Sequence, residues 1–266
     1  MPESKTISSD VETDKSPGVE GLSESPPSLL SPNNQRSPQL LPQTWGHLVT
    51  LGVTGSGKTT LARALIQHRS RVLVVDPKEE YAGQAIQVGS GEELAAAVAA
   101  SPGRWRLAYY NNHLEQDFAA LCDTVDRLGR CTFVVEETDW YCSPNQIHPG
   151  LEYLLKYGRP RPNRPESGVE VWCLARRPSE IHRLCTSQAS AVFCFQTYEK
   201  ADLEYLRNYV SDEYSQDLAA LPVYDPPQST VAVCKQQLRR AGARPVYWEV
   251  DPRLATVKPL VVDSGQ

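Results

Sequence analysis

The sequence predicts an α/β fold in which helices cover both faces of a mainly parallel sheet. Short, continuous apolar runs recur along the chain, and segments with apolar residues at helical spacing separate them. A strand that is buried on both faces is apolar throughout, and parallel strands need crossover helices between them. The regular alternation of the two patterns from residue 45 onward therefore indicates one α/β domain over residues 45–266.

The predicted elements follow one another closely along this domain. Predicted strands cover residues 47–51, 72–75, 85–88, 107–110, 132–135, 169–174, 191–195, 230–234 and 245–250. Predicted helices cover residues 58–68, 92–100, 114–128, 151–157, 179–184, 201–209 and 212–221. The clearest helix is 114–128, because Leu114, Phe118, Leu121 and Val125 fall on one face.

Residues 1–44 have a different character. Ser, Pro, Glu and Asp dominate this segment, and it contains no aromatic residue. Ordering such a segment costs conformational entropy with little apolar burial in return. We therefore expect residues 1–44 to form a disordered, acidic tail.

Charge and hydropathy restrict the classes of function. The chain of 266 residues has 27 basic and 32 acidic residues and a formal net charge of −5. This balance excludes a strongly basic general nucleic-acid coat but allows local basic contacts with DNA. No apolar run approaches the ~18–20 residues of a membrane span, and the N-terminus lacks the pattern of a signal peptide. We expect a protein without a membrane span in the cytoplasm.

A glycine-rich loop joins the first predicted strand to the first predicted helix. Its residues are Gly52, Val53, Thr54, Gly55, Ser56, Gly57, Lys58 and Thr59, which fit G-x-x-x-x-G-K-[ST], with Thr60 next in the helix. Glycines let the backbone wrap closely around phosphates, and the helix adds its positive N-terminal end. Lys58 would reach the β- and γ-phosphates, and the Thr59 hydroxyl would hold Mg²⁺. The loop predicts binding of a nucleoside triphosphate with magnesium.

An acidic pair ends the predicted strand 132–135. Glu136 and Glu137 follow its last apolar residue, and the carboxyl ends of parallel strands border the ligand crevice. One acid there can hold magnesium, and a second can orient and deprotonate the attacking water. We assign Glu136 to the metal and Glu137 to the general base. The alternative is a solvated acidic strand end without a catalytic role.

Five segments in order resemble the HerA–FtsK superfamily of hexameric DNA-translocating ATPases, which includes viral genome-packaging ATPases. They are 52–60 (GVTGSGKTT), 74–81 (VVDPKEEY), 133–137 (FVVEE), 174–181 (LARRPSEI) and 189–206 (ASAVFCFQTYEKADLEYL). The first segment is generic, whereas the second and fourth, in that order, discriminate. Asp76 and Lys78 are similar to a family motif beside the nucleotide, although a strand-end turn accounts for them equally well. The GTPase signature N-K-x-D and the ABC-cassette signature L-S-G-G-Q are both absent.

The resemblance implies a RecA-like P-loop NTPase sheet, a hexameric ring of subunits and ATP sites at the subunit junctions. Lys58, Thr59, Glu136 and Glu137 carry over as the residues that handle ATP and Mg²⁺. Two positions depart from the family pattern. The metal-side acid is usually Asp, and Glu136 is one methylene longer. The polar sensor, commonly Gln, falls on Arg176, which is either a cationic sensor near the γ-phosphate or a surface arginine.

Three arginines occupy the proline-rich loop 158–165 (GRPRPNRP). The prolines make this an extended, non-helical segment. Three interpretations of the loop stay open. It supplies an arginine finger to a neighbouring subunit's nucleotide, it contacts DNA phosphates, or it is a solvated surface loop. Arg159 lies nearest to the family's arginine and is our first choice for the finger.

We therefore expect an ATP-driven translocase of double-stranded DNA that works as a ring and packages a viral or prophage genome. The short segment before Gly52 leaves no room for the additional domain of HerA-type proteins, which favours a minimal packaging motor. A capsid vertex or portal protein would then be a further partner, in the host cytoplasm or at the assembling virion. Two alternatives stay open: a cellular HerA-like DNA-processing or conjugation motor, and an ATP-binding assembly switch without translocation.

Overall fold

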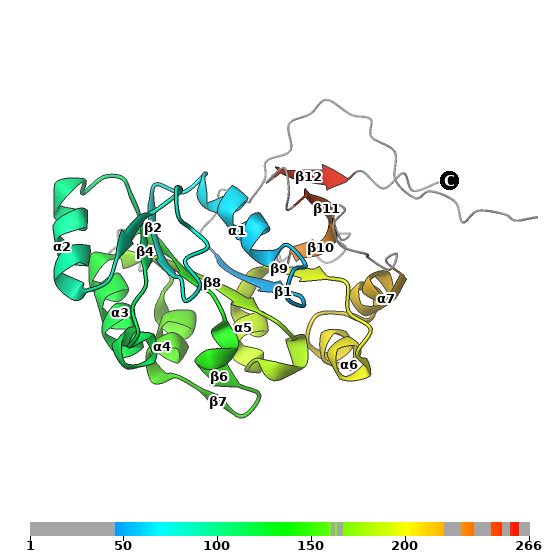
Figure 1. Ribbon diagram of the computed structural model, residues 1–266. Helices are drawn as coiled ribbons and strands as arrows, with labels where there is room; N and C mark the ends of the chain where they lie inside the picture. The colour runs from blue at the N-terminus through cyan, green and yellow to red at the C-terminus, as the bar shows by residue number, and fades with distance from the viewer. Residues whose placement is uncertain are drawn as a thin grey trace, which may run out of the picture.

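The structure is a computed structural model that describes residues 46–160, 163, 167–220, 230–236, 246–251 and 256–260. The expected tail, residues 1–44, lies outside these residues, and its disorder stays a prediction. The described part contains a sheet whose strands all belong to one twisted layer, with helices on either side of its parallel portion (Figure 1).

Seven neighbouring strands of this sheet run parallel to one another. In spatial order they are β9 (Ala189–Phe195), β1 (His47–Leu51), β8 (Val169–Ala175), β5 (Cys131–Val135), β2 (Arg71–Val75), β4 (Trp105–Tyr109) and β3 (Ile86–Val88). Every residue of β1, β5 and β8 is buried, which explains why these strands are mostly apolar. The predicted α/β class with a mainly parallel sheet is confirmed.

Three antiparallel strands extend the sheet beyond β9. They are β10 (Thr230–Gln236), β11 (Val246–Asp251) and β12 (Thr256–Leu260). The first two lie where the sequence predicts strands, whereas β12 has no counterpart among the predicted elements.

More helices cover one face of the parallel strands than the other. The helices are α1 (Lys58–Ile66), α2 (Gly91–Ala100), α3 (Leu114–Leu128), α4 (Pro149–Tyr157), α5 (Arg183–Gln188), α6 (Lys200–Tyr209) and α7 (Asp212–Ala220). On one face, Leu61 and Leu65 of α1 pack with Phe193 of β9. The opposite face is covered by residues from α2 to α7, including Phe118 of α3 and Leu154 of α4 (Figure 1). One long apolar layer therefore lies on each side of the sheet.

The prediction of a helix over residues 179–184 is wrong. A 3₁₀ turn, η3 (Pro178–Glu180), is followed by extended backbone at Ile181 before α5 begins. The buried Asp202 carboxylate of α6 explains this, because its Oδ1 accepts hydrogen bonds from the Ser179 backbone N–H at 3.1 Å and the Ser179 hydroxyl at 2.5 Å. A tertiary contact thus fixes a non-helical path that local spacing does not reveal.

The connection from β5 to α4 carries short elements of its own. A 3₁₀ turn, η1 (Thr138–Trp140), leads into a small hairpin of β6 (Cys142–Ser143) and β7 (Gln146–Ile147). These elements begin directly after the acidic pair 136–137, so the pair lies at the point where the chain leaves the sheet.

Candidate functional site

Four adjacent strands deliver charged residues to the same edge of the sheet. Strands β1, β8, β5 and β2 are neighbours in that order and run in the same direction. Their carboxyl ends therefore lie side by side. They are followed, respectively, by the phosphate loop, Arg176, the acidic pair 136–137 and the turn 76–81.

The phosphate loop has backbone conformations that require glycine. Gly55 and Gly57 have φ values of 81° and 101°, in the left-handed region that residues with a Cβ rarely adopt. At Gly52, a Cβ would approach Ser56 Oγ to 2.5 Å and Phe195 Cβ to 2.8 Å. The loop is thus held tightly against β9 while its tip turns outward, and α1 begins immediately after Gly57.

Lys58 is folded back over this loop. Its Nζ donates hydrogen bonds to the carbonyl oxygens of Gly52 (2.7 Å) and Val53 (3.2 Å). Burial lowers the pKa of Lys58, and the nearby carboxylates of Glu136 and Glu137 act in the opposite direction. The ammonium group is therefore partly withdrawn from water and faces the two acids at the end of β5.

Glu136 is a buried acid with a hydroxyl partner. Its side chain is only 4% exposed, and Oε1 accepts a hydrogen bond from the Tyr81 hydroxyl at 2.7 Å. Burial is the main cause that raises the pKa of Glu136 to about 7 and the charge of Glu80 adds to it, while the hydrogen bond from Tyr81 and the charge of Lys58 act against it. The carboxyl is thus balanced between its neutral and ionised forms near neutral pH.

The turn 76–81 after β2 is fixed by Asp76. The fully buried Asp76 carboxylate accepts hydrogen bonds from the backbone N–H groups of Glu80 (2.9 Å) and Tyr81 (3.0 Å). This geometry brings the Glu80 carboxylate to the hydroxyl of Thr59, which donates to Glu80 Oε2 at 3.1 Å. The same turn carries Lys78 toward the end of β5.

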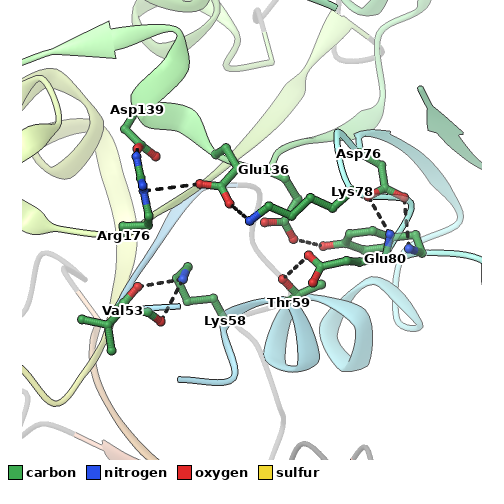
Figure 2. Close-up of polar contacts among 12 residues, drawn as sticks. Val53, Lys58, Thr59, Asp76, Lys78, Glu80, Glu136, Asp139 and Arg176 are labelled. Atoms are coloured by element: carbon green, nitrogen blue, oxygen red, sulfur yellow. Dashed lines mark hydrogen bonds and ion pairs between the residues drawn. The ribbon is translucent and has the colours of Figure 1, made fainter. Parts of the chain in front are cut away.

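Glu137 lies between two cations. Its backbone is left-handed, with φ 47° and ψ 49°, so its side chain leaves the strand direction. Oε1 accepts a hydrogen bond from Lys78 Nζ, and Oε2 lies 3.6 Å from Arg176 Nε. Arg176 also donates to Asp139 Oδ2 from Nη2 at 2.6 Å. Figure 2 shows Arg176 and Asp139 at one end of this row of contacts.

A single cavity collects most of the predicted site residues. It is lined by Thr54, Gly55, Gly57, Lys58, Thr59, Thr60, Lys78, Glu80, Glu136 and Glu137. Lys58 and Glu137 therefore share one pocket with Thr59 and Glu136. Figure 2 shows Lys58 and Thr59 on the loop and helix α1, below the residues that come from the end of β5 and the turn after β2. Gly52, Val53 and Ser56 shape the loop without lining the cavity, and Arg176 contacts it through Glu137.

Arg159 lies at the other end of the sheet. It follows Gly158, whose carbonyl oxygen accepts a hydrogen bond from the N–H of Val169, the first residue of β8. His47 is the first residue of β1. Burial, and to a smaller extent the charge of Arg159, lower the pKa of His47 to about 4. The five residues of β1 span roughly 16 Å, so Arg159 is separated by that length from its own phosphate loop. Arg161 and Arg164 lie outside the described residues.

The side chains around Thr59 suit a hard divalent cation. Mg²⁺ prefers oxygen ligands, and the Thr59 hydroxyl and the carboxylates of Glu80 and Glu136 face one another in this cavity. Burial alone favours the neutral form of Glu136, whereas a bound cation favours the ionised form. The donor set thus fits magnesium, and Thr59 and Glu136 are the residues that would hold it.

Glu80 and Tyr81 have no role predicted from the sequence, and the sequence leaves two interpretations of Lys78 open. All three contact the predicted residues directly. A signal was available, because the turn 76–81 also follows a buried apolar strand, and the strand-end argument used for Glu136 and Glu137 applies to it equally.

Comparisons with known proteins bear on the fold and on the family resemblance. Residues 46–124 match the family model of the central domain of the helicase HerA. No curated protein matches the sequence. The genome-packaging NTPase B204 from Sulfolobus turreted icosahedral virus 2, in complex with AMPPCP, is a similar solved structure, with 17% identity, a TM-score of 0.55, and coverage of 81% of this chain and 97% of that chain.

A second similar structure is B204, the DNA-packaging ATPase from Sulfolobus turreted icosahedral virus. It has 14% identity and a TM-score of 0.54, with 81% of this chain and 97% of that chain covered. At these identities the likeness establishes the fold, which is that of a P-loop NTPase. Together with the match over residues 46–124, it confirms the resemblance to the HerA–FtsK superfamily. None of the helices in the described part of the chain has the length and apolar character to cross a membrane.

The buried acid generates a pH-dependent contribution to stability. Because the pKa of Glu136 is raised to about 7 from 4.5, the native state keeps a proton between these pH values that the unfolded state has lost. The free energy of unfolding should therefore fall as pH rises through this window, by up to about 3 kcal/mol. Urea unfolding at pH 5 and pH 8 should show this loss in the wild type and a clearly smaller loss in Glu136→Gln. An equal decrease in the free energy of unfolding in both proteins would contradict the raised pKa of Glu136.

Proposed function

We propose that this HerA–FtsK-type P-loop ATPase hydrolyses ATP to move double-stranded DNA, and that it works as a ring that packages a viral or prophage genome. The observation that carries the proposal is the shared cavity of Lys58, Thr59, Glu136 and Glu137. A triphosphate-binding loop and two carboxylates at one strand end are the parts that phosphoryl transfer to water requires.

Each residue has a definite role in the proposed reaction. The loop amides and Lys58 bind the β- and γ-phosphates, with the phosphate oxygens replacing the carbonyls that Lys58 contacts now. Glu137 orients a water molecule and accepts its proton as the water oxygen attacks the γ-phosphorus. The bond from that phosphorus to the bridging β-phosphate oxygen breaks, and ADP and phosphate leave. When bound, Mg²⁺ neutralises charge on the β- and γ-phosphate oxygens.

The DNA part of the proposal is supported by the comparisons. The similar structures are described as genome- or DNA-packaging enzymes, and the family match is to the HerA central domain. A ring would also give Arg159 a function, because an arginine at the far end of the sheet can reach only the nucleotide of another subunit. We assign Arg159 to that contact and Arg176 to sensing the γ-phosphate through its position beside Glu137.

Loss of the loop lysine should abolish hydrolysis. In Lys58→Ala the ammonium that contacts the phosphates is missing, and we expect both basal and DNA-stimulated ATPase activity to fall to background. Glu137→Gln should keep ATP binding but lower kcat by about 10²–10⁴, the typical contribution of a general base. Phosphate release measured with and without double-stranded DNA checks both expectations.

The matched control is Lys156→Ala, because Lys156 forms an exposed pair with Glu152 on the surface of α4. This variant should hydrolyse ATP at the wild-type rate. A purified ring that hydrolyses ATP without any response to DNA would contradict the translocase. Very slow turnover with tight ATP binding would instead favour the assembly switch.

A mixing experiment tests the position of Arg159. Arg159→Ala should lower kcat strongly, since an arginine finger contributes about 10³–10⁵ in rate where it operates. Subunits that carry Lys58→Ala still present an intact Arg159. Mixed rings of the two inactive variants should therefore regain part of the ATPase activity, because one kind of subunit completes the site of the other. If the mixture stays as inactive as its components, Arg159 does not act across a subunit junction.

A further inference from the structure

The carboxylate assigned as general base is not free in this structure. Glu137 is 11% exposed, and each of its two oxygens faces a cation: Oε1 pairs with Lys78 and Oε2 lies 3.6 Å from Arg176. A carboxylate that is paired in this way is held in place and is a poor proton acceptor, because its negative charge is already shared with the cations. One of the pairs must loosen before Glu137 can accept a proton from water.

We propose that Lys78 is a positioning residue that exchanges partners: it holds Glu137 until a γ-phosphate enters the cavity, and then binds the γ-phosphate and releases Glu137 to activate water. This inference rests on the proposed function and adds to it a second lysine that distinguishes ATP from ADP.

The geometry of the cavity supports such an exchange. Lys78 and Lys58 line the same pocket as the loop and the acidic pair, so a γ-phosphate placed at Lys58 is within the space that Lys78 also faces. Phosphate oxygens carry more charge than one carboxylate and form strong charge-assisted hydrogen bonds with ammonium groups. A triphosphate is thus able to compete with Glu137 for Lys78.

The side chain of Lys78 can move while its backbone stays fixed. The turn that carries it is anchored at Asp76 through the N–H groups of Glu80 and Tyr81, and the Tyr81 hydroxyl is bonded to Glu136. The Lys78 side chain itself is 48% exposed, and partly exposed ion pairs are weak because water and ions screen them. A flexible lysine on a rigid turn is suited to change partners at low cost.

Arg176 lacks this freedom. It donates from both Nε (3.0 Å) and Nη2 (2.6 Å) to Asp139 Oδ2, and Asp139 belongs to η1 directly after the acidic pair. The guanidinium is therefore tied to the segment that carries Glu137, and it keeps the carboxylate oriented after Lys78 has left. In this proposal, Arg176 keeps the Glu137 carboxylate oriented, whereas Lys78 releases it.

Equilibrium binding of ATPγS and ADP in the presence of Mg²⁺ tests the exchange. Lys78→Met should weaken ATPγS binding by about tenfold, the effect of losing one hydrogen bond to a charged group, while ADP binding stays within about twofold. Lys78→Arg should keep most of the preference for ATPγS. Lys156→Met removes a lysine of similar exposure, which pairs with Glu152 on α4, and should leave both affinities unchanged. Circular dichroism melts of the variants check that each is folded.

A second comparison addresses the link to Glu137. Glu137→Gln removes the partner that Lys78 must leave, so it should tighten ATPγS binding more in the wild-type background than in the Lys78→Met background, by about two- to fivefold, the size of a partly exposed ion pair. The opposite order would show that Lys78 stays on Glu137 when nucleotide is bound, and it would overturn the proposal.

The remaining outcomes separate this inference from the proposed function. Equal weakening of ATPγS and ADP binding by Lys78→Met would make Lys78 a general phosphate ligand and overturn the exchange alone. A folded wild-type chain that binds neither nucleotide would overturn the proposed function, and this inference with it.

Discussion

The arrangement depends on the shared direction of four neighbouring strands. Because β1, β8, β5 and β2 are adjacent and parallel, the segments that follow them meet at one edge of the sheet. All four strands are largely buried and mostly apolar, and the charged residues of the site follow their carboxyl ends. The phosphate loop, an arginine, two glutamates and a lysine-bearing turn therefore converge, although Lys78 and Glu137 are 59 positions apart along the chain.

This convergence sets up an unusual balance of charge. Lys58 and Lys78 face Glu80, Glu136 and Glu137 around one cavity, and burial acts against the charged forms of Lys58 and Glu136 alike. Such a site is suited to bind a polyanion together with a cation. The phosphate oxygens would pair with the lysines, and Mg²⁺ would pair with the acids. In the proposed exchange, Lys78 pairs with the γ-phosphate of a bound triphosphate and with Glu137 when no γ-phosphate is present.

The sequence predicted those parts of the site in which local pattern determines structure. The phosphate loop is contiguous, and its glycine conformations follow from its spacing. The acids at 136–137 could be placed because an apolar run ends there. The same argument could have placed the turn 76–81 at this edge. The contacts of Lys78 with Glu137 and of Tyr81 with Glu136 also depend on the order of strands in the sheet, which a pattern of apolar runs does not specify.

The errors in the predicted elements have similar causes. Residues 179–184 have the composition of a helix, yet Ser179 donates hydrogen bonds to the carboxylate of Asp202, which lies in α6. Strand β12 follows β11 after a short connection, and its sequence, TVKPL, includes a proline that disfavours a strand assignment. As an edge strand it tolerates the proline, since only one side of an edge strand is paired. In both places, tertiary context decides what the local sequence leaves open.

The most direct test of the central claim is a crystal structure of this chain with Mg²⁺ and a non-hydrolysable ATP analogue. The account predicts the triphosphate inside the cavity between the phosphate loop and the end of β5. Its γ-phosphoryl group should be within hydrogen-bonding distance of Lys58, and the Glu137 carboxylate should face the side from which water attacks. A nucleotide bound elsewhere, or bound in the loop with Glu137 directed away from its γ-phosphoryl group, would contradict the account.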